Sequence, residues 1–565
     1  NPQTGHLSAD FPVTLDDIQR IEVIKGAAAR VYGAGAFNGA INIVTTPSTS
    51  HSPSLVETDS IRFIHPSHST PLTLNIEGGS FGTFGLSARG EHIASSKGRL
   101  TNSLSASYKQ SDGATANSYF RKSTAYYQGG MTLSASQLSS LSWSLGLSTM
   151  RYGANTFYSA AYPDQYESNA RIYANVKADL APFSGCFGKT IHLLPTVYWN
   201  RNYDHFQLIR HSTTGENFHR NDVLGASLNA YCNWLLGRTS VGVELRKEKI
   251  YSTNLGVPMA EEEYFKVPHY DVNYTKSKAR TDVSFFVEHN ILLKDFTASL
   301  GVMANKNTGY KNSYRFYPGI DMSYRPSNCL KLTASWNMAF RMPTFTDLFY
   351  KSPTQEGNIG LKPEKTTSLR IGGLYRAQGI QAQLGGFYDW GTDMIDWVMY
   401  TADDVFHSAN FDLDNMGVQA QATLRFAPLF GKADSYLQRL SVGYTYLHQR
   451  RRDDTEIYKS NYAMEYLRHK LVATLDHRIV SHLSASWCVR WQDRMGDYIL
   501  YEDGRSTGQL VSYSPYATLD LKLRWTERHY EVWVEGTNLT NHTYYDLGNI
   551  PQPGIVVLAG VRVRF

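Results

Sequence analysis

The side chains best suited to catalysis or metal binding are spread along this chain without the spacing that such chemistry requires. The four cysteines, Cys186, Cys232, Cys329 and Cys488, are far apart and form no C-x-x-C pair. No H-E-x-x-H motif occurs, and serine, histidine and aspartate form no compact hydrolase-like grouping. We therefore expect no enzymatic activity, and we expect the cysteines to be small residues in strands and turns.

Composition narrows the class of protein. The formal net charge of +5 is too small to argue for nucleic-acid binding, and no basic helix or zinc-finger spacing is present. The mean hydropathy is negative, and no run approaches the roughly 18 apolar residues of a transmembrane helix. The unusual feature is an aromatic content of 13%, dominated by tyrosine. A transmembrane β-barrel explains these facts together, because its strands face lipid only at alternate positions while aromatic girdles line both interfaces.

Apolar and polar residues alternate with a period of two along much of the chain from about residue 71 onward. In the clearest stretch, Leu330, Leu332, Ala334, Trp336, Met338 and Phe340 alternate with Lys331, Thr333, Ser335, Asn337 and Arg341. The same pattern recurs in residues 519–525 and 555–565. Such strands have one apolar and one polar face. In a soluble sandwich the apolar face would cover a core, whereas in a barrel it meets lipid.

The lengths of the connections distinguish these two folds. Short turns are expected near 96–98, 235–238, 292–295, 325–328, 378–380 and 526–529, and longer loops over 152–166, 207–219, 254–276, 342–364, 401–409, 450–459, 495–512 and 541–553. Long and short connections alternate, as they do in an outer-membrane barrel with short turns at one end and long loops at the other. The sequence therefore predicts an all-β fold, a transmembrane antiparallel β-barrel of about 22 strands.

Residues 16–46 form a distinct segment, DDIQRIEVIKGAAARVYGAGAFNGAINIVTT. We expect a short helix, a strand, a glycine-rich turn and a second strand. The first apolar face is assigned to Ile18, Ile21, Val23 and Ile24. Gly33, Gly35 and Gly39 permit positive φ or close backbone approach. A dinucleotide-binding loop is the alternative, but it needs G-x-G-x-x-G between a strand and a helix, and here the spacing differs and a strand follows.

This segment resembles the end of the plug domain in TonB-dependent outer-membrane receptors. The motif is carried by Glu22, Gly26, Arg30, Tyr32, Gly33, Gly39 and Asn42. One departure is Ala27, which follows Gly26 where the family usually has proline. The chain's end, with EGTNLTN at 535–541, Tyr544 and a final alternating strand that ends in Phe565, resembles the closing signature of the same family.

The resemblance implies a division into the C-terminal part of a plug over residues 1–48, a linker over 49–69 and a barrel over 70–565. The family's plug is longer than residues 1–48. The chain also opens without the charged and apolar regions of a signal peptide. We therefore expect the first plug strands and the partner-binding box to be absent from this chain.

The family imports scarce nutrients across the outer membrane of Gram-negative bacteria, so the resemblance implies a multi-pass transporter with no required cofactor. Its implied partners are the TonB–ExbB–ExbD energy-transducing complex, a large nutrient ligand and outer-membrane lipid, with no nucleic acid. A surface lipoprotein that caps the barrel, as some receptors of this type have, stays an open alternative.

The segment FRMPTFTDLFY at 340–350, followed by EGNIGLKPE at 356–364, looks most like the cobalamin (vitamin B12) receptors of this superfamily. Cobalamin is large, neutral overall and amphipathic, so its site needs aromatic surfaces with amide or hydroxyl partners. The candidate binding residues are Asn155, Phe157, Tyr158, Tyr162, Asp164, Tyr166, Tyr264 and Tyr270. Some cobalamin receptors order their loops with calcium, and Glu261, Glu262, Glu263, Asp403 and Asp404 are the candidate ligands, without an EF-hand pattern.

Three other functions remain open. Haem receptors usually carry a histidine in the loop between Arg341 and Glu364, and this loop has none. The histidines elsewhere that keep the haem alternative open are His6, His65, His68, His211, His219, His269 and His407. An iron-siderophore receptor is a further alternative within the family, and a passive porin or adhesin barrel is the alternative outside it.

We expect Arg341 and Glu364 to pair across the base of their loop.

Overall fold

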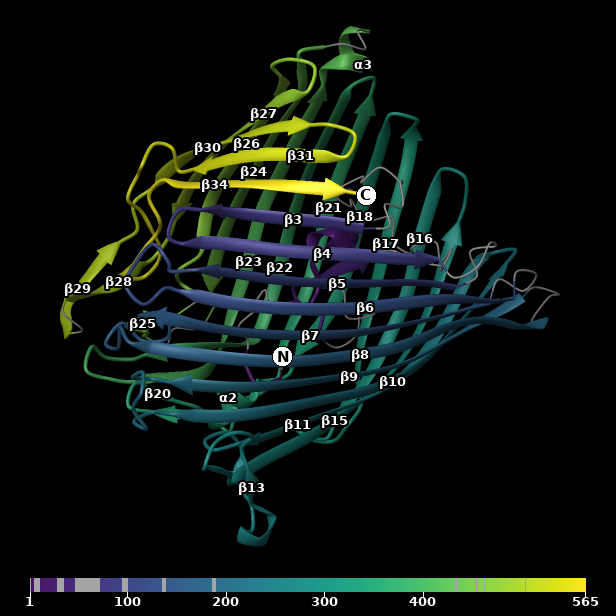
Figure 1. The fold of residues 1–565 in the computed structure, drawn as a ribbon. Helices are drawn as coiled ribbons and strands as arrows, with labels where there is room; N and C mark the ends of the chain where they lie inside the picture. Colours follow the sequence, from purple (N-terminus) through teal and green to yellow (C-terminus); the bar gives the residue numbers. More distant parts are fainter. Residues whose placement is uncertain are drawn as a thin grey trace.

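The computed structural model describes residues 2–4, 11–27, 35–45, 72–93, 100–134, 139–184, 190–431, 435–452, 456–461, 463–502 and 505–565. Within these residues, 22 long strands form one closed antiparallel barrel (Figure 1). They are β3 (Leu72–Gly79), β4 (Thr83–Ile93), β5 (Leu100–Ser111), β6 (Phe120–Ser134), β7 (Ser139–Asn155), β8 (Gln165–Ser184), β9 (Thr190–Gln207), β10 (Asn217–Trp234), β11 (Gly237–Ser252), β15 (Lys276–Leu292), β16 (Phe296–Asn307), β17 (Arg315–Ser327), β18 (Leu330–Arg341), β21 (Glu364–Ala377), β22 (Ile380–Met399), β23 (Phe406–Arg425), β24 (Leu437–Arg451), β26 (Leu467–Arg478), β27 (Leu483–Arg494), β30 (Tyr516–Thr526), β31 (Tyr530–Thr537) and β34 (Val556–Arg564). The predicted fold class is confirmed.

The barrel closes between its first and last strands. β3 pairs with β34, with Ile76 opposite Val561, and β3 also pairs with β4. The terminal Phe565 donates its backbone N–H to the carbonyl of Leu72 at 3.0 Å. Because the wall has no open edge, its backbone groups pair with neighbouring strands, as a bilayer requires.

Short elements decorate the connections. They are β12 (Val257–Pro258), η3 (Glu261–Glu263), β13 (Phe265–Lys266), β14 (Asn273–Tyr274), α2 (Phe345–Phe349), β19 (Lys351–Ser352), β20 (Gln355–Glu356), α3 (Phe426–Phe430), β25 (Lys459–Ser460), β28 (Asp497–Glu502), β29 (Arg505–Ser512), β32 (Tyr545–Leu547) and β33 (Ile550–Pro551). No helix in the described ranges is long and apolar enough to cross a membrane.

Side chains alternate across the wall as the period-two pattern predicts. Leu104 and Ile371 face outward and are 59% and 63% exposed, whereas Ser105 and Ser368, one and three positions away along the same strands, are buried on the inner side. Successive residues of a strand point to opposite faces. The outer face is therefore a band of aliphatic and aromatic side chains suited to lipid, and the inner face is polar.

The two ends of the barrel differ in the length of their connections. We call one end of the barrel the turn end, because it has short turns at 235–236, 293–295, 328–329, 378–379, 479–482 and 527–529. We call the opposite end the loop end. Its longer connections are 112–119, 156–164, 208–216, 253–275, 308–314, 342–363, 400–405, 452–466, 495–515 and 538–555. The predicted alternation is confirmed for the expected connections, and the structure adds the loops 112–119 and 308–314, the turn 479–482 and a tight loop-end turn at 80–82. The turn expected near 96–98 lies outside the described residues.

A two-stranded sheet lies inside the barrel, visible in purple behind β4 and β5 (Figure 1). It consists of β1 (Ile18–Lys25) and β2 (Gly39–Thr45), preceded by the 3-10 helix η1 (Leu15–Asp17). We call it the luminal sheet. Polar contacts of this sheet and of η1 reach strands around the wall and include Asp16 with Asn75 and Arg562, Asp17 with Arg89 and Ser105, Thr45 with Gln128, and Lys25 with Gln419. The expected short helix and the two strands are present in that order, and most of the expected turn between the strands lies outside the described residues.

Two glycines of the luminal sheet meet a conformational requirement. Gly39 has φ +146°, and a Cβ there would lie 2.3 Å from the carbonyl oxygen of Ile24. Gly26 has φ +81° and lies against the guanidinium of Arg370 on β21. The same expectation is wrong for Gly35, around which space is open and φ is not positive. Gly33, Arg30 and Tyr32 of the motif, and residues 49–69 assigned to a linker, lie outside the described residues.

The expected apolar face of β1 needs a correction. Val23 is exposed, whereas its neighbour Ile24 is buried. Adjacent residues of a strand cannot share a face, so the four aliphatic side chains are divided between two faces. Glu22, on the Ile24 side, is buried and accepts hydrogen bonds from Arg20 and Asn42 at 2.7 and 2.8 Å.

Candidate functional site

A cavity of about 480 Å³ lies at the loop end, bounded by the N-terminal residues, several long loops and the inward-facing ends of strands. We call it the loop-end cavity. Its aromatic lining consists of Phe157, Tyr158, Phe206, Tyr350, Trp397, Phe406, Tyr498 and Tyr501. Amide and hydroxyl groups are contributed by Gln3, Thr156, Ser159, Asn217, Gln355, Asn461 and Asn549. Aromatic surfaces with a few polar groups suit a large amphipathic ligand.

The short helix α2 forms one side of this cavity. The Asp347 N–H donates to Thr344 Oγ1 at 3.1 Å, and the Thr344 N–H donates to Asp347 Oδ2 at 2.9 Å. This reciprocal capping stabilises a helix that would be too short to form alone. The carbonyls of Pro2 and Gln3 accept the first helical N–H groups at 2.9 and 2.8 Å. The N-terminal segment is thereby fixed against the loop, and Gln3 reaches the cavity.

Two ion pairs hold the loop that carries α2. Arg341 and Glu364 are direct partners on β18 and β21 and form an ion pair, which confirms the expected pairing. Arg280 bonds Glu248 at 2.6 Å and also donates to the carbonyl of Pro343 at 2.6 Å. Most of the FRMPTFTDLFY segment therefore has a structural role in shaping the cavity.

The β22–β23 hairpin is tied to the same helix. Trp397 donates its indole N–H to Asp347 Oδ1 at 3.2 Å, and the Ser408 hydroxyl donates to the Asp347 carbonyl at 2.7 Å. The side chain of Asp347 therefore both caps α2 and holds Trp397, which is part of the aromatic lining of the cavity. A buried indole with a satisfied N–H presents a rigid apolar surface to a ligand.

A polar network occupies another part of the cavity. Glu167 and Asp204 project inward from β8 and β9, and the Tyr158 hydroxyl donates to Glu167. Gln3 donates its amide to Asp204 Oδ2 at 2.5 Å and accepts from Asn221. Burial, followed by the charge of Glu167, raises the pKa of Tyr158 well above its usual value of 10.0. The Tyr158 hydroxyl is therefore a neutral donor at physiological pH.

The charged side chains that line the cavity are mostly acidic. Glu167 and Asp204 are joined by Asp403, Asp404 and Glu465. Lys459 is the one lysine among the described lining residues, and it forms an ion pair with Glu465. Carboxylates without matching cations disfavour an anionic ligand.

The eight residues predicted to bind substrate divide into three groups. Phe157 and Tyr158 line the loop-end cavity. Tyr166 and Tyr270 instead surround His205, with the Tyr270 hydroxyl 3.1 Å from His205 Nδ1. Asn155, Tyr162, Asp164 and Tyr264 do not belong to the described lining of the cavity.

The position of Tyr270 follows from how its loop packs. His205 lies between the inward-facing Asp204 and Phe206, so it points to the outside of the barrel. Val267 and Tyr274 of loop 253–275 pack on the outward-facing Phe218. The β13–β14 hairpin of this loop consequently lies against the outer wall, away from the cavity.

The candidate calcium residues do not converge. Among the described residues, no group of three or more histidine, cysteine, aspartate or glutamate side chains is placed to hold a metal ion. Glu261–Glu263 form the exposed helix η3. Asp404 bonds His407 at 3.0 Å and accepts two backbone N–H groups, and the His407 contact is the main cause of a lowered pKa of Asp404. These residues do not fit a calcium site in this arrangement.

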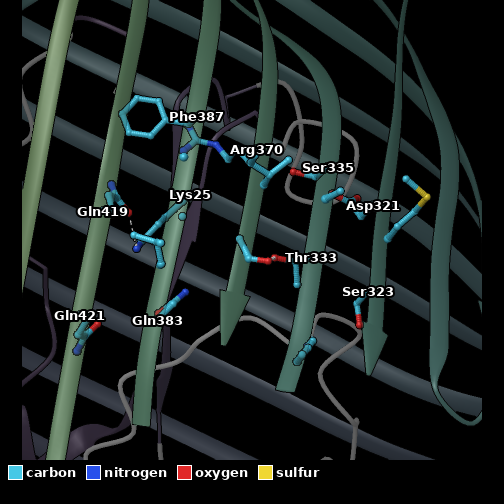
Figure 2. A pocket seen from close by; sticks show the side chains of 18 of the residues that line it. Lys25, Asp321, Ser323, Thr333, Ser335, Arg370, Gln383, Phe387, Gln419 and Gln421 are labelled. Atoms are coloured by element: carbon cyan, nitrogen blue, oxygen red, sulfur yellow. Dashed lines mark hydrogen bonds between the residues drawn. The ribbon is translucent and has the colours of Figure 1, made fainter. Parts of the chain in front are cut away.

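A second cavity, of about 790 Å³, lies toward the turn end, between Lys25 of the luminal sheet and the wall strands β11, β15–β18, β21–β24 and β26 (Figure 2). Its polar lining includes Asp321, Ser323, Thr333, Ser335, Gln383, Gln419 and Gln421. Lys25 Nζ donates to Gln419 Oε1 at 2.7 Å, which is the dashed line in Figure 2. Few aromatic side chains face this space, so it matches an amphipathic ligand less well than the loop-end cavity does.

One hydrolase-like spacing has a structural role. Residues 78–82 read G-G-S-F-G and fit the Gly-x-Ser-x-Gly pattern, whose serine sits between a strand and a helix in hydrolases. Here the segment is the turn between two strands, β3 and β4. The N–H of Ser80 donates to the Val557 carbonyl, and its hydroxyl accepts the Val557 N–H, both at 2.9 Å. This serine closes the barrel seam.

Sequence reasoning missed several lining residues. Asp204 and Trp397 stand at inward positions close to the ends of strands that precede long loops, so counting the alternation to the strand's end would have found them. Gln3 and Tyr501 come from remote segments and reach the cavity through tertiary packing, for which no local signal exists.

A family profile described as TonB dependent receptor-like, beta-barrel, matches residues 71–539. Among curated proteins, the vitamin B12 transporter BtuB of Vibrio vulnificus is 21% identical over 407 residues, which are 70% of this chain and 58% of that protein. BtuB of Photobacterium profundum is 22% identical over 404 residues, covering 69% and 57%. The matches therefore span a little over half the length of these relatives.

Solved structures with the same fold include a mutant ferric enterobactin receptor from Pseudomonas aeruginosa in complex with enterobactin, with a TM-score of 0.75, 16% identity and coverage of 98% of this chain and 87% of that one. The FrpB iron transporter of Neisseria meningitidis has a TM-score of 0.73 and 15% identity, with coverage of 97% and 87%. At these identities the likeness is one of fold.

Proposed function

We infer that this chain, which belongs to the TonB-dependent receptor family, imports a large nutrient across the outer membrane of a Gram-negative bacterium by energy-coupled transport. The family and the closed barrel place the chain in that membrane. A lumen as wide as that of a 22-stranded barrel is not selective by itself, so binding at the loop end has to supply the selectivity.

The nutrient we propose is cobalamin or a related corrinoid. Curated relatives at 21–22% identity are vitamin B12 transporters. The observation that carries the proposal is the lining of the loop-end cavity, in which aromatic faces and neutral hydroxyls stand beside carboxylates. A cavity of about 480 Å³ takes only part of a corrinoid, so the remainder of the ligand would extend among the surrounding loops.

The charge of the lining separates this substrate from the iron-carrying alternatives. Ferric catecholate siderophores are polyanionic, and haem carries two propionates. Lys459 is paired with Glu465, so the other carboxyl groups leave the lining with a negative excess, which disfavours both ligands. Cobalamin is neutral overall and pays no such penalty. We therefore rank haem and ferric siderophores below corrinoids for this site.

Residues 1–48 act in this proposal as the C-terminal part of a plug, residues 49–69 as a linker and residues 70–565 as the transporting barrel. The contacts of Asp16, Asp17, Lys25 and Thr45 hold the luminal sheet in the barrel at rest. The TonB–ExbB–ExbD complex would supply the work that displaces this sheet. The ligand would then pass from the loop-end cavity toward the second cavity, near the turn end.

Calorimetry with detergent-purified protein tests the substrate. We expect cyanocobalamin to bind with nanomolar to micromolar affinity and haemin and ferric enterobactin to bind at least tenfold more weakly, because of the charge of the lining. Haemin or enterobactin binding more tightly than cyanocobalamin would overturn the corrinoid assignment. Failure of all three to bind would also overturn it, unless a surface lipoprotein added to the mixture restored cyanocobalamin binding.

Two variants locate the site. Phe157→Ala removes an aromatic surface from the cavity and is expected to weaken cyanocobalamin binding about tenfold, as loss of a buried aromatic contact does. Tyr264→Ala is the matched control, because Tyr264 lies on the loop that packs against the outer wall. Equal loss in both variants would place the ligand outside the loop-end cavity.

A further inference from the structure

Three adjacent wall strands, β9, β10 and β11, carry a cation on their outer face, on the loop-end side of the aliphatic band. In each strand the cation stands four residues from an outward aliphatic side chain, as Arg201 does from Val197, Arg220 from Leu224 and Lys249 from Leu245. All three aliphatic side chains are strongly exposed on the barrel exterior. Four residues of a tilted strand rise about 10 Å, which is the step from acyl chains to headgroups.

The centre of this group has more cations than carboxylates. Asp222 accepts from Arg201 Nε at 2.6 Å and from Arg220 Nε at 2.9 Å, so both of its oxygens are engaged by arginine. Lys249 is the direct cross-strand neighbour of Asp222, and Lys247 lies one outward position nearer the lipid. In the described part of the chain neither lysine has a carboxylate within ion-pair distance. We call this group the outer basic cluster and define it as Arg201, Arg220, Lys247 and Lys249. The cluster therefore carries a net positive charge.

Aromatic rings hold these cations close to the wall. Arg201 lies over Trp199 with its guanidinium carbon 5.1 Å from the ring centre. Arg220 and Lys249 flank Tyr251 at 5.3 and 4.3 Å. Rings under the cations restrict their side chains without neutralising them. Their remaining N–H groups stay available to a ligand.

The cluster lies between the aliphatic band and a projecting hairpin. Below it is the aliphatic band of Leu224 and Leu245. Above it is the β13–β14 hairpin, which projects from the loop end (Figure 1), and Phe265 of this hairpin lies 5.9 Å from the Arg220 guanidinium. A ligand seated here would have an apolar part beside the band and an anionic part at the cations.

The far wall differs in its charge balance. There Arg452 is paired with two carboxylates, Asp414 at 3.0 Å and Asp412 at 3.7 Å. At this point of the far wall the cation is matched by acids of the protein itself, in contrast to the excess on β9–β11.

We propose that the outer basic cluster binds the phosphate groups of an anionic glycolipid in the outer leaflet of the membrane. Lipid of this kind supplies acyl chains for the aliphatic band and phosphates at the height of the cations. Juxtamembrane lysine and arginine side chains attract anionic headgroups by about 1 kcal/mol each, and arginine adds bidentate phosphate bonding. The lipid would brace the strands beneath loop 253–275, so this site is separate from the nutrient cavity.

The test compares two lipid probes on the full chain in neutral detergent. We expect lipid A with its phosphates intact to bind at least tenfold more tightly than dephosphorylated lipid A, measured by native mass spectrometry. The variant R201Q/R220Q/K247Q/K249Q should remove this difference. The matched control K294Q/R376Q/R425Q/R528Q, which removes four exposed cations at the turn end, should retain it. Heat-dependent electrophoretic migration verifies that each variant is a folded barrel.

Three results would overturn the proposal. The first is equal binding of intact and dephosphorylated lipid A to the unmodified chain, and the second is an unchanged preference in the folded cluster variant. The third is full displacement of intact lipid A by millimolar inorganic phosphate, which would assign the cluster to free phosphate instead of lipid. Retention of cyanocobalamin binding by the cluster variant would show that the two sites are independent.

Discussion

Replacing Asp17 with alanine is expected to release the luminal sheet from the barrel wall. Asp17 is completely buried and accepts hydrogen bonds from Ser105 on β5 at 2.6 Å and from the N–H and hydroxyl of Thr14 at 2.8 Å. Its other oxygen is 3.4 Å from Arg89 Nε on β4. One carboxylate therefore connects the start of β1 to two wall strands.

The magnitude follows from this burial. Removing one partner of a buried ion pair costs about 3–5 kcal/mol, because the other charge is left uncompensated. Arg89 keeps Glu91 at 3.2 Å, so we take the lower end of that range. At about 1.4 kcal/mol per factor of ten, the local opening constant of the luminal sheet should rise roughly 100-fold.

Hydrogen exchange measures this opening. Amides of residues 18–25 should lose about 100-fold in protection in Asp17→Ala, while amides of β4 and β5 keep theirs. Lys25→Gln is the matched control, because it disturbs an exposed hydrogen bond of the same sheet to Gln419. An exposed contact contributes about 1 kcal/mol or less, so protection should fall by about fivefold at most.

Three outcomes would refute this reasoning. Protection of residues 18–25 that stays within threefold in Asp17→Ala would mean that the ion pair does not hold the sheet. An equal loss in Lys25→Gln would mean that burial does not distinguish the two contacts. Loss of protection in β4 and β5 as well would make Asp17 a determinant of barrel stability instead of an anchor for the luminal sheet.

Other predictions follow from the same structure. Gly39→Ala should destabilise the luminal sheet by about 1–3 kcal/mol, because the backbone of Gly39 has positive φ and a neighbouring carbonyl fills the Cβ position. Gly35→Ala, with open space around the residue, should change stability by less than about 0.5 kcal/mol. Hydrogen exchange of β1 and β2 compares the two variants. The raised pKa of Tyr158 means that the folded loop favours the neutral hydroxyl. The contribution of Tyr158 to loop stability is therefore complete below pH 10 and is lost as the pH rises from 10 toward the pKa of the folded state. Absorbance at 295 nm should show one fewer late-titrating tyrosine in Tyr158→Phe. Chelation of calcium should leave cyanocobalamin affinity within about twofold, because Asp404 is already bonded to protein donors and the acidic loop residues do not converge, and a larger loss in calorimetry would contradict this.

The parts of the fold that were predictable from sequence depend on local regularities. A period of two is a property of each strand alone, so the wall and its two faces could be deduced without knowing which strands are neighbours. The length difference between turns and loops is equally local. The Arg341–Glu364 pair was also predictable, because the two residues are the last and first of two strands joined by one loop and are therefore register partners.

The site was harder to predict, because it depends on which way individual side chains point. Tyr166 and Glu167 are adjacent, yet Glu167 bonds Tyr158 in the cavity, while Tyr166 lies by His205 on the outer wall. A tyrosine-rich segment contains both kinds of position, and composition cannot separate them. Tyr270 was misplaced for a different reason, since its loop turns outward to cover Phe218.

Strand alternation resolves the first kind of error and explains the outer basic cluster as well. Counting outward from any exposed aliphatic residue assigns every second side chain of that strand to the exterior. On β9 this places Val197 and Arg201 outside and Asp204 inside. The same strand thus directs a cation toward the lipid surface and a carboxylate toward the nutrient cavity. A one-residue shift in register would exchange these charges between the two sites, so the wall's register determines both the acidity of the cavity and the positive charge of the rim.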